Sequence, residues 1–142
     1  MNYLLDLQVV SKSNFIPLNK IKLWVYYLLR NKVYNIEFNI KIVDKLEMLY
    51  YSNRYKNNCF HINVLTFPSN FICNNDYLFI GDIVICSSVI FNDNKKSELG
   101  VDYYWFDVIV HSVINLIYPN RSVCDEFYIQ NFKKSLENYF NL

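Results

Sequence analysis

Apolar and polar residues follow two different periods along this chain, and each period predicts one kind of element. Residues 34–43 alternate between apolar and polar side chains, which is typical of a strand with one face in solvent. After Pro17, apolar residues recur at helical spacing as far as Arg30, which predicts an amphipathic helix. The same reasoning predicts further strands at 3–10, 62–67 and 78–86, and further helices at 45–52, 101–118 and 123–140.

Prolines and polar residues mark the predicted boundaries of these elements. Asp44 is placed to cap the helix that follows it, and Pro68 is expected to stop the preceding strand. Pro119 separates the last two helices, because proline cannot continue a helix. We expect polar loops at 53–61 and 70–77, a helix or turn at 87–92 and a charged connector at 92–100.

The order of these elements indicates the fold class. Strands mixed with helices predict an α/β (α+β) fold, in which a small mixed β-sheet of about four strands is flanked by helices. A chain of 142 residues is long enough for one hydrophobic core, so we expect a single domain over residues 1–142. The helix at 101–118 is the most apolar of the predicted helices, and we expect it to lie centrally.

A polar stripe runs along this apolar helix. Asp107, His111 and Asn115 are spaced by four residues, so they share one helical face. Burying such groups without partners costs free energy, so the stripe needs partners, a metal ion or a cleft. His111 is therefore the candidate site residue. A catalytic zinc needs about three protein ligands, however, and His61 is the only other histidine in the chain.

Charge and composition narrow the function classes only a little. With 53% hydrophobic residues and two glycines, the chain is neither disordered nor collagen-like. Its net charge is +1, but residues 1–60 hold nine Lys and Arg against four Asp and Glu, whereas residues 61–142 hold five against nine. A basic first half is compatible with a phosphate-binding surface, and equally with an ordinary solvated mixture of charges.

Cysteine spacing and apolar runs indicate the compartment. The four cysteines show no CxxC spacing and no signal peptide precedes them, so we expect a cytoplasmic protein with free thiols. The apolar runs 80–91 and 108–118 are too short to span a bilayer, and Asp82 and His111 interrupt them. We therefore expect no membrane segment.

Two motifs resemble a known family. Residues 63–68 read Asn-Val-Leu-Thr-Phe-Pro, and residues 81–85 read Gly-Asp-Ile-Val-Ile. At this spacing they are similar to the bacterial YbeY family of rRNA maturation factors. Shorter matches at 5–8 and 42–44, together with His111, extend the resemblance over nearly the whole chain.

The resemblance implies a function and partners. YbeY-like proteins are single-strand-specific metallo-endoribonucleases that act in small-subunit rRNA maturation and ribosome quality control, so zinc would be the cofactor. RNA and the small ribosomal subunit would be the partners, with no role for membrane or DNA. Lys56 aligns with a family arginine and would neutralise phosphate charge. His111 would be a zinc ligand or a proton-transfer group.

The chain departs from the family's zinc motif. The pattern His-x3-His-x5-His falls on His111, Asn115 and Arg121. Asn115 offers only a neutral carbonyl oxygen, which is a poor zinc ligand, and Arg121 carries a fixed positive charge that repels a metal. A non-catalytic RNA- or ribosome-binding factor that lacks the zinc is therefore the alternative to an enzyme.

The neighbouring site residues also have two interpretations each. Asp107 would orient His111 or serve as a makeshift ligand, and His111 itself could be a structural histidine that holds Asp107. Asp82 would have a structural role at the edge of the cleft, or would belong to a simple bulge in a strand. Lys56 is a phosphate contact or a solvated loop lysine.

Overall fold

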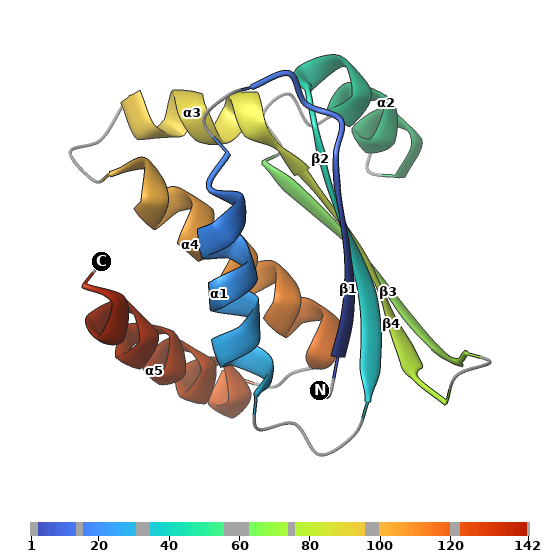
Figure 1. The fold of residues 1–142 in the computed structure, drawn as a ribbon, viewed down its shortest axis with the longest axis vertical. Helices are drawn as coiled ribbons and strands as arrows, with labels where there is room; N and C mark the ends of the chain where they lie inside the picture. The colour runs from blue at the N-terminus through green and yellow to red at the C-terminus, as the bar shows by residue number, and fades with distance from the viewer. Residues whose placement is uncertain are drawn as a thin grey trace.

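The computed structural model describes residues 3–13, 16–30, 35–55, 63–73, 76–95, 100–119 and 123–141. Strands and helices alternate in the first part of the chain, and helices close it (Figure 1). In chain order the elements are β1 (Tyr3–Val9), α1 (Leu18–Leu29), β2 (Ile36–Val43), α2 (Lys45–Tyr55), β3 (Val64–Ile72), β4 (Leu78–Cys86), α3 (Ser87–Lys95), α4 (Val101–Ile117) and α5 (Val123–Phe140).

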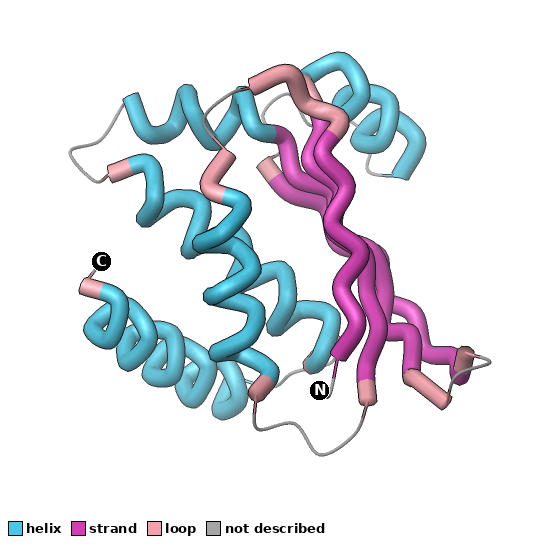
Figure 2. The backbone as a smooth tube through the Cα atoms, viewed as in Figure 1, coloured by secondary structure: helices cyan, strands magenta, loops and turns pink. Residues whose placement is uncertain are grey.

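The strands form one mixed sheet in the order β1-β2-β4-β3. Strands β1, β2 and β4 are parallel to one another, and β3 runs antiparallel to β4 at the edge of the sheet. Helices α1, α4 and α5 lie to one side of the sheet, and α2 lies beyond its other side (Figures 1 and 2). The predicted α+β fold, with a mixed four-stranded sheet flanked by helices, is confirmed.

Alternation along β2 sorts its side chains between the two faces of the sheet. The apolar residues from Ile36 to Ile42 are at most 1% exposed and pack against α1 and α4, whereas Glu37, Asn39 and Lys41 are only partly buried. On the helical side, Trp24 of α1 meets Phe106 of α4 edge to face, with ring centroids 5.4 Å apart. A smaller apolar cluster covers part of the other face, formed by Val43, Met48, Leu65, Val84, Cys86 and Val89.

Three predicted boundaries were wrong. Strand β3 continues through Pro68 to Ile72 instead of stopping, so part of the predicted loop is strand. Proline is tolerated there because β3 is an edge strand, where a missing N–H costs no ladder hydrogen bond on the open side. Helices α2 and α3 also run further than expected, to Tyr55 and Lys95.

Gly81 lets the sheet and α4 approach closely. Its φ is +140°, a value that side chains rarely allow, and the β2–β4 register shifts just beside it. A Cβ atom here would overlap the carbonyl oxygen of Phe67 and would lie 2.9 Å from Cδ2 of Leu116. Glycine at this position therefore sets how closely β3, β4 and α4 pack.

Within the described part of the chain, no helix is both long and apolar enough to cross a membrane.

Candidate functional site

The polar stripe lies on α4, as the sequence predicted. Asp107, His111 and Asn115 are partly exposed on successive turns, while all six residues between them are buried. The side chains of Asp107 and His111 are 35% and 33% exposed, and His111 Nε2 lies 3.5 Å from Asp107 Oδ1. The stripe is therefore the accessible edge of a core helix.

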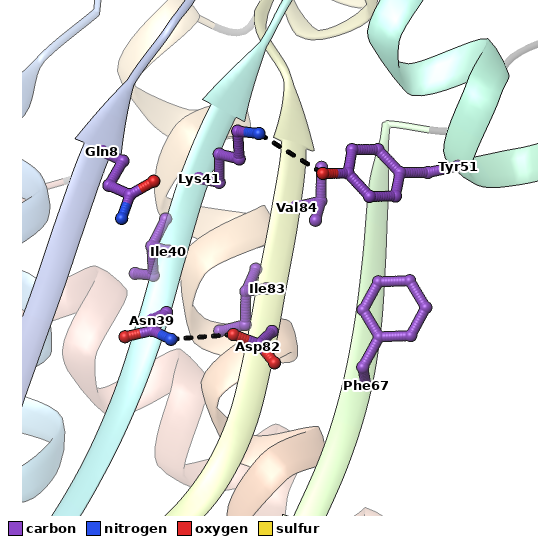
Figure 3. Close-up of a pocket in the computed structure, with 9 residues that line it drawn as sticks. All are labelled: Gln8, Asn39, Ile40, Lys41, Tyr51, Phe67, Asp82, Ile83 and Val84. Atoms are coloured by element: carbon purple, nitrogen blue, oxygen red, sulfur yellow. Dashed lines mark hydrogen bonds between the residues drawn. The ribbon is translucent and has the colours of Figure 1, made fainter.

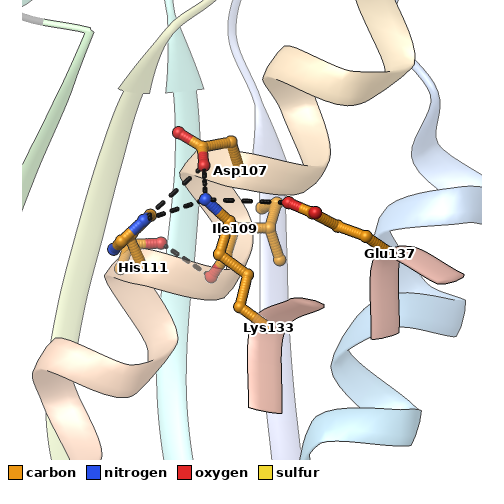
Figure 4. Close-up of polar contacts among 6 residues, drawn as sticks. Asp107, Ile109, His111, Lys133 and Glu137 are labelled. Atoms are coloured by element: carbon orange, nitrogen blue, oxygen red, sulfur yellow. Dashed lines mark hydrogen bonds and ion pairs between the residues drawn. The ribbon is translucent and has the colours of Figure 1, made fainter. Parts of the chain in front are cut away.

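A lysine from α5 completes this cluster. Nζ of Lys133 donates a hydrogen bond to Oδ1 of Asp107 and lies 3.2 Å from Nε2 of His111. It also lies 3.9 Å from Oε1 of Glu137, one turn further along α5. Figure 4 shows the ammonium between the two carboxylates and the imidazole.

Lys133 and Glu137 were not among the site residues predicted from the sequence. Lys133 is only 8% exposed, and it lies on the same face of α5 as the buried residues Ile129 and Leu136. These three positions are spaced by four and three residues, which is the spacing of a core-facing stripe. A lysine on the apolar stripe of a helix was therefore the signal that could have revealed this contact.

Burial makes the Lys133 charge expensive unless it is paired. The effective penalty for removing an ion from water is several kcal/mol, and a well-placed opposite charge has to offset it. Asp107 provides that charge from α4, and Glu137 provides a second one from α5. The cluster thus joins the two helices and holds an ammonium directly beside an imidazole.

The described residues around His111 do not fit a zinc ion. Zinc is bound by lone pairs of nitrogen, sulfur or carboxylate oxygen, whereas an ammonium has only hydrogen-bond donors and repels a cation. Nε2 of His111 faces the ammonium of Lys133. Across the described ranges, no group of three or more His, Cys, Asp or Glu side chains is arranged to hold a metal.

Two other predicted contributors, Lys56 and Arg121, lie outside the described residues, as does His61. The structure therefore brings together Asp107 and His111, with Asn115 one turn further along the same face, and adds Lys133 and Glu137 to them.

Asp82 lies elsewhere, on the opposite face of the sheet from α4. It is paired in register with Asn39, and both side chains point away from the buried face formed by Ile40 and Ile83. Nδ2 of Asn39 donates a hydrogen bond of 2.9 Å to Oδ1 of Asp82. Asp82 is therefore separated from His111 by the sheet.

Asp82 lines a pocket of about 480 Å³ on this open face (Figure 3). Nζ of Lys41 lies 3.3 Å from the hydroxyl oxygen of Tyr51 and forms an ion pair with Glu47. Both contacts raise the pKa of Lys41 above its ordinary value, the Tyr51 hydrogen bond most, so its ammonium stays charged at neutral pH. The aromatic rings of Tyr51 and Phe67 form one wall. An ammonium, an amide–carboxylate pair and aromatic rings are groups that can bind a polar, planar ligand.

Comparisons with known proteins agree on one family. The family model described as "Endoribonuclease YbeY" matches residues 8–118. An "Endoribonuclease YbeY" of Blochmanniella floridana is 36% identical over 125 residues, which is 87% of this chain and 81% of that protein. The protein of the same name from Pseudomonas syringae pv. syringae is 29% identical over 114 residues, covering 80% of this chain and 69% of that protein.

A solved structure supports the fold. The solution structure of TM1509 from Thermotoga maritima superposes with a TM-score of 0.65, covering 97% of this chain and 92% of that one, at 13% sequence identity. The family match spans the strands β2, β3 and β4 and all of α4, where His111 lies. The chain therefore belongs to the YbeY family of endoribonucleases.

Proposed function

We propose that this protein cleaves single-stranded RNA in the cytoplasm during maturation of small-subunit rRNA and in ribosome quality control. The observation that carries this proposal is the family match over residues 8–118, which includes the helix that presents His111 at an accessible edge. RNA and the small ribosomal subunit are the proposed partners, and no DNA or membrane partner is proposed.

The proposed chemistry uses two residues of this chain. His111 would transfer a proton at the scissile phosphate, since its ring is accessible and an imidazole can act near neutral pH. Lys56 would neutralise the charge that develops on the phosphate oxygens. Zinc is the cofactor expected for the family, but because the described residues do not fit it, no step is assigned to a metal.

A second candidate function is RNA or ribosome binding without cleavage. The contact between Lys133 and His111 favours it, because this contact occupies Nε2 of the one histidine that remains from the zinc motif. In this case the basic first half of the chain would still bind phosphate groups.

One pair of assays separates the two candidates. Binding of a single-stranded RNA should weaken steeply with salt, and Lys56→Ala should weaken it by about 1 kcal/mol, the scale of one charge-assisted contact. Lys45→Ala is the matched control, since Lys45 is an exposed lysine of the same basic half.

Cleavage of the same RNA is then followed with and without added zinc. Cleavage that His111→Ala abolishes supports the enzyme, and salt-dependent binding with no cleavage supports the binding factor. An RNA affinity that changes neither with salt concentration nor in Lys56→Ala would contradict both candidates.

A further inference from the structure

Lys133 is a nearly buried charge in a helix whose one other lysine, Lys134, is placed differently. Its side chain is 10% exposed and lies between the apolar positions of α5, whereas the next residue, Lys134, is exposed. Removing an ammonium from water is unfavourable without compensation. Its position must therefore be fixed by specific partners rather than by solvation.

Those partners are groups that also bind divalent cations. The ammonium contacts a carboxylate oxygen of Asp107 and an imidazole nitrogen of His111, and it forms an ion pair with Glu137 (Figure 4). Each presents a lone pair or a negative charge toward Nζ. These oxygen and nitrogen atoms could donate electron pairs to a metal ion, but in this structure they face the ammonium of Lys133 instead.

The other two positions of the zinc motif hold residues that bind a metal ion weakly or repel it. Asn115 has no charge, and Arg121 has a positive charge. With His111 as the single imidazole of the motif, a metal would have too few strong ligands to compete with a cation that is already tethered to the chain.

We propose that the ammonium of Lys133 takes the place of a metal ion beside His111, as a cation that belongs to the chain itself. Lys133 is then a positioning residue: it holds the His111 ring and balances Asp107, so that the site keeps its shape and positive charge without a metal. The inference goes beyond the proposed function and holds for either candidate.

The test compares zinc binding to the full-length protein and to Lys133→Met, which keeps the apolar stem of the side chain and removes the charge. Calorimetric titration with zinc should show affinity at least about tenfold higher for Lys133→Met, the scale on which one adjacent like charge disfavours a cation. The gain should disappear in the double variant Lys133→Met/His111→Ala. Lys134→Ala is the matched control and should bind zinc as the unchanged protein does.

Two results of this titration would overturn the proposal. One is equal zinc affinity for the unchanged protein and Lys133→Met, and the other is a gain that survives the loss of His111. A measurement on the unchanged protein covers the case in which Lys133→Met does not fold. After chelator treatment, its unfolding temperature should be the same with and without equimolar zinc, and a zinc-dependent rise that His111→Ala removes would also overturn the proposal.

Discussion

Replacing Gly81 by alanine should strongly destabilise the protein. The left-handed φ of +140° disfavours any side chain, and such backbone strain costs about 1–3 kcal/mol. The added Cβ would also overlap the carbonyl oxygen of Phe67 and lie 2.9 Å from Cδ2 of Leu116. Overpacking of this kind costs a further ~1–3 kcal/mol. Because the clash involves backbone atoms, the flexible end of a side chain cannot relieve it.

Urea unfolding followed by circular dichroism measures this loss. A loss of about 4 kcal/mol, at a slope of about 2 kcal/mol/M, lowers the unfolding midpoint by about 2 M. Gly100→Ala is the matched control, because Gly100 has an ordinary φ of −69° and nothing lies within 4 Å of an added Cβ. Its substitution should cost about 1 kcal/mol, the typical loss when a favoured N-cap residue is replaced by alanine. If Gly81→Ala and Gly100→Ala unfolded at the same urea concentration, the close approach of β3, β4 and α4 at Gly81 would be refuted.

Two further predictions concern the metal and the hydrogen bonds of Asp44 to the segment that follows β1. The purified protein should contain far less than stoichiometric zinc by mass spectrometry, and replacing both Asn115 and Arg121 by histidine should raise the zinc content, because each added imidazole is a strong ligand. Stoichiometric zinc in the unchanged protein, or no gain in the double variant, would contradict this. Asp44→Ala should lower the free energy of unfolding by about 1–3 kcal/mol, because its carboxylate accepts hydrogen bonds from Oγ of Ser11 at 2.7 Å and from a backbone N–H. Asp6→Ala, which removes only an exposed contact with a side chain two residues away, should change stability by less than about 0.5 kcal/mol, and a similar loss for both variants would argue against the Asp44 contacts.

Local periodicity was enough to predict most elements, because each one buries a single face. Strand β2 alternates and helix α1 repeats at helical spacing, and both lie where that spacing put them. Strand β3 was predicted too short because the effect of Pro68 depends on whether its strand lies inside the sheet or at the edge. Strand order is a property of the whole chain, so no local pattern contains it.

The spacing of Asp107, His111 and Asn115 was sufficient to place them on one face of a helix, because residues four apart share a helical face. Which side chains contact this face depends instead on how the folded helices pack. The contact of Lys133 with His111 joins residues 22 positions apart, and it depends on how α5 packs against α4. The tertiary structure also places Asp82 on the other face of the sheet, because the pairing register of β2 with β4 sets the direction in which the Asp82 side chain points. Side-chain chemistry and periodicity are local, whereas the neighbours that give a charged group its role come from packing between distant segments.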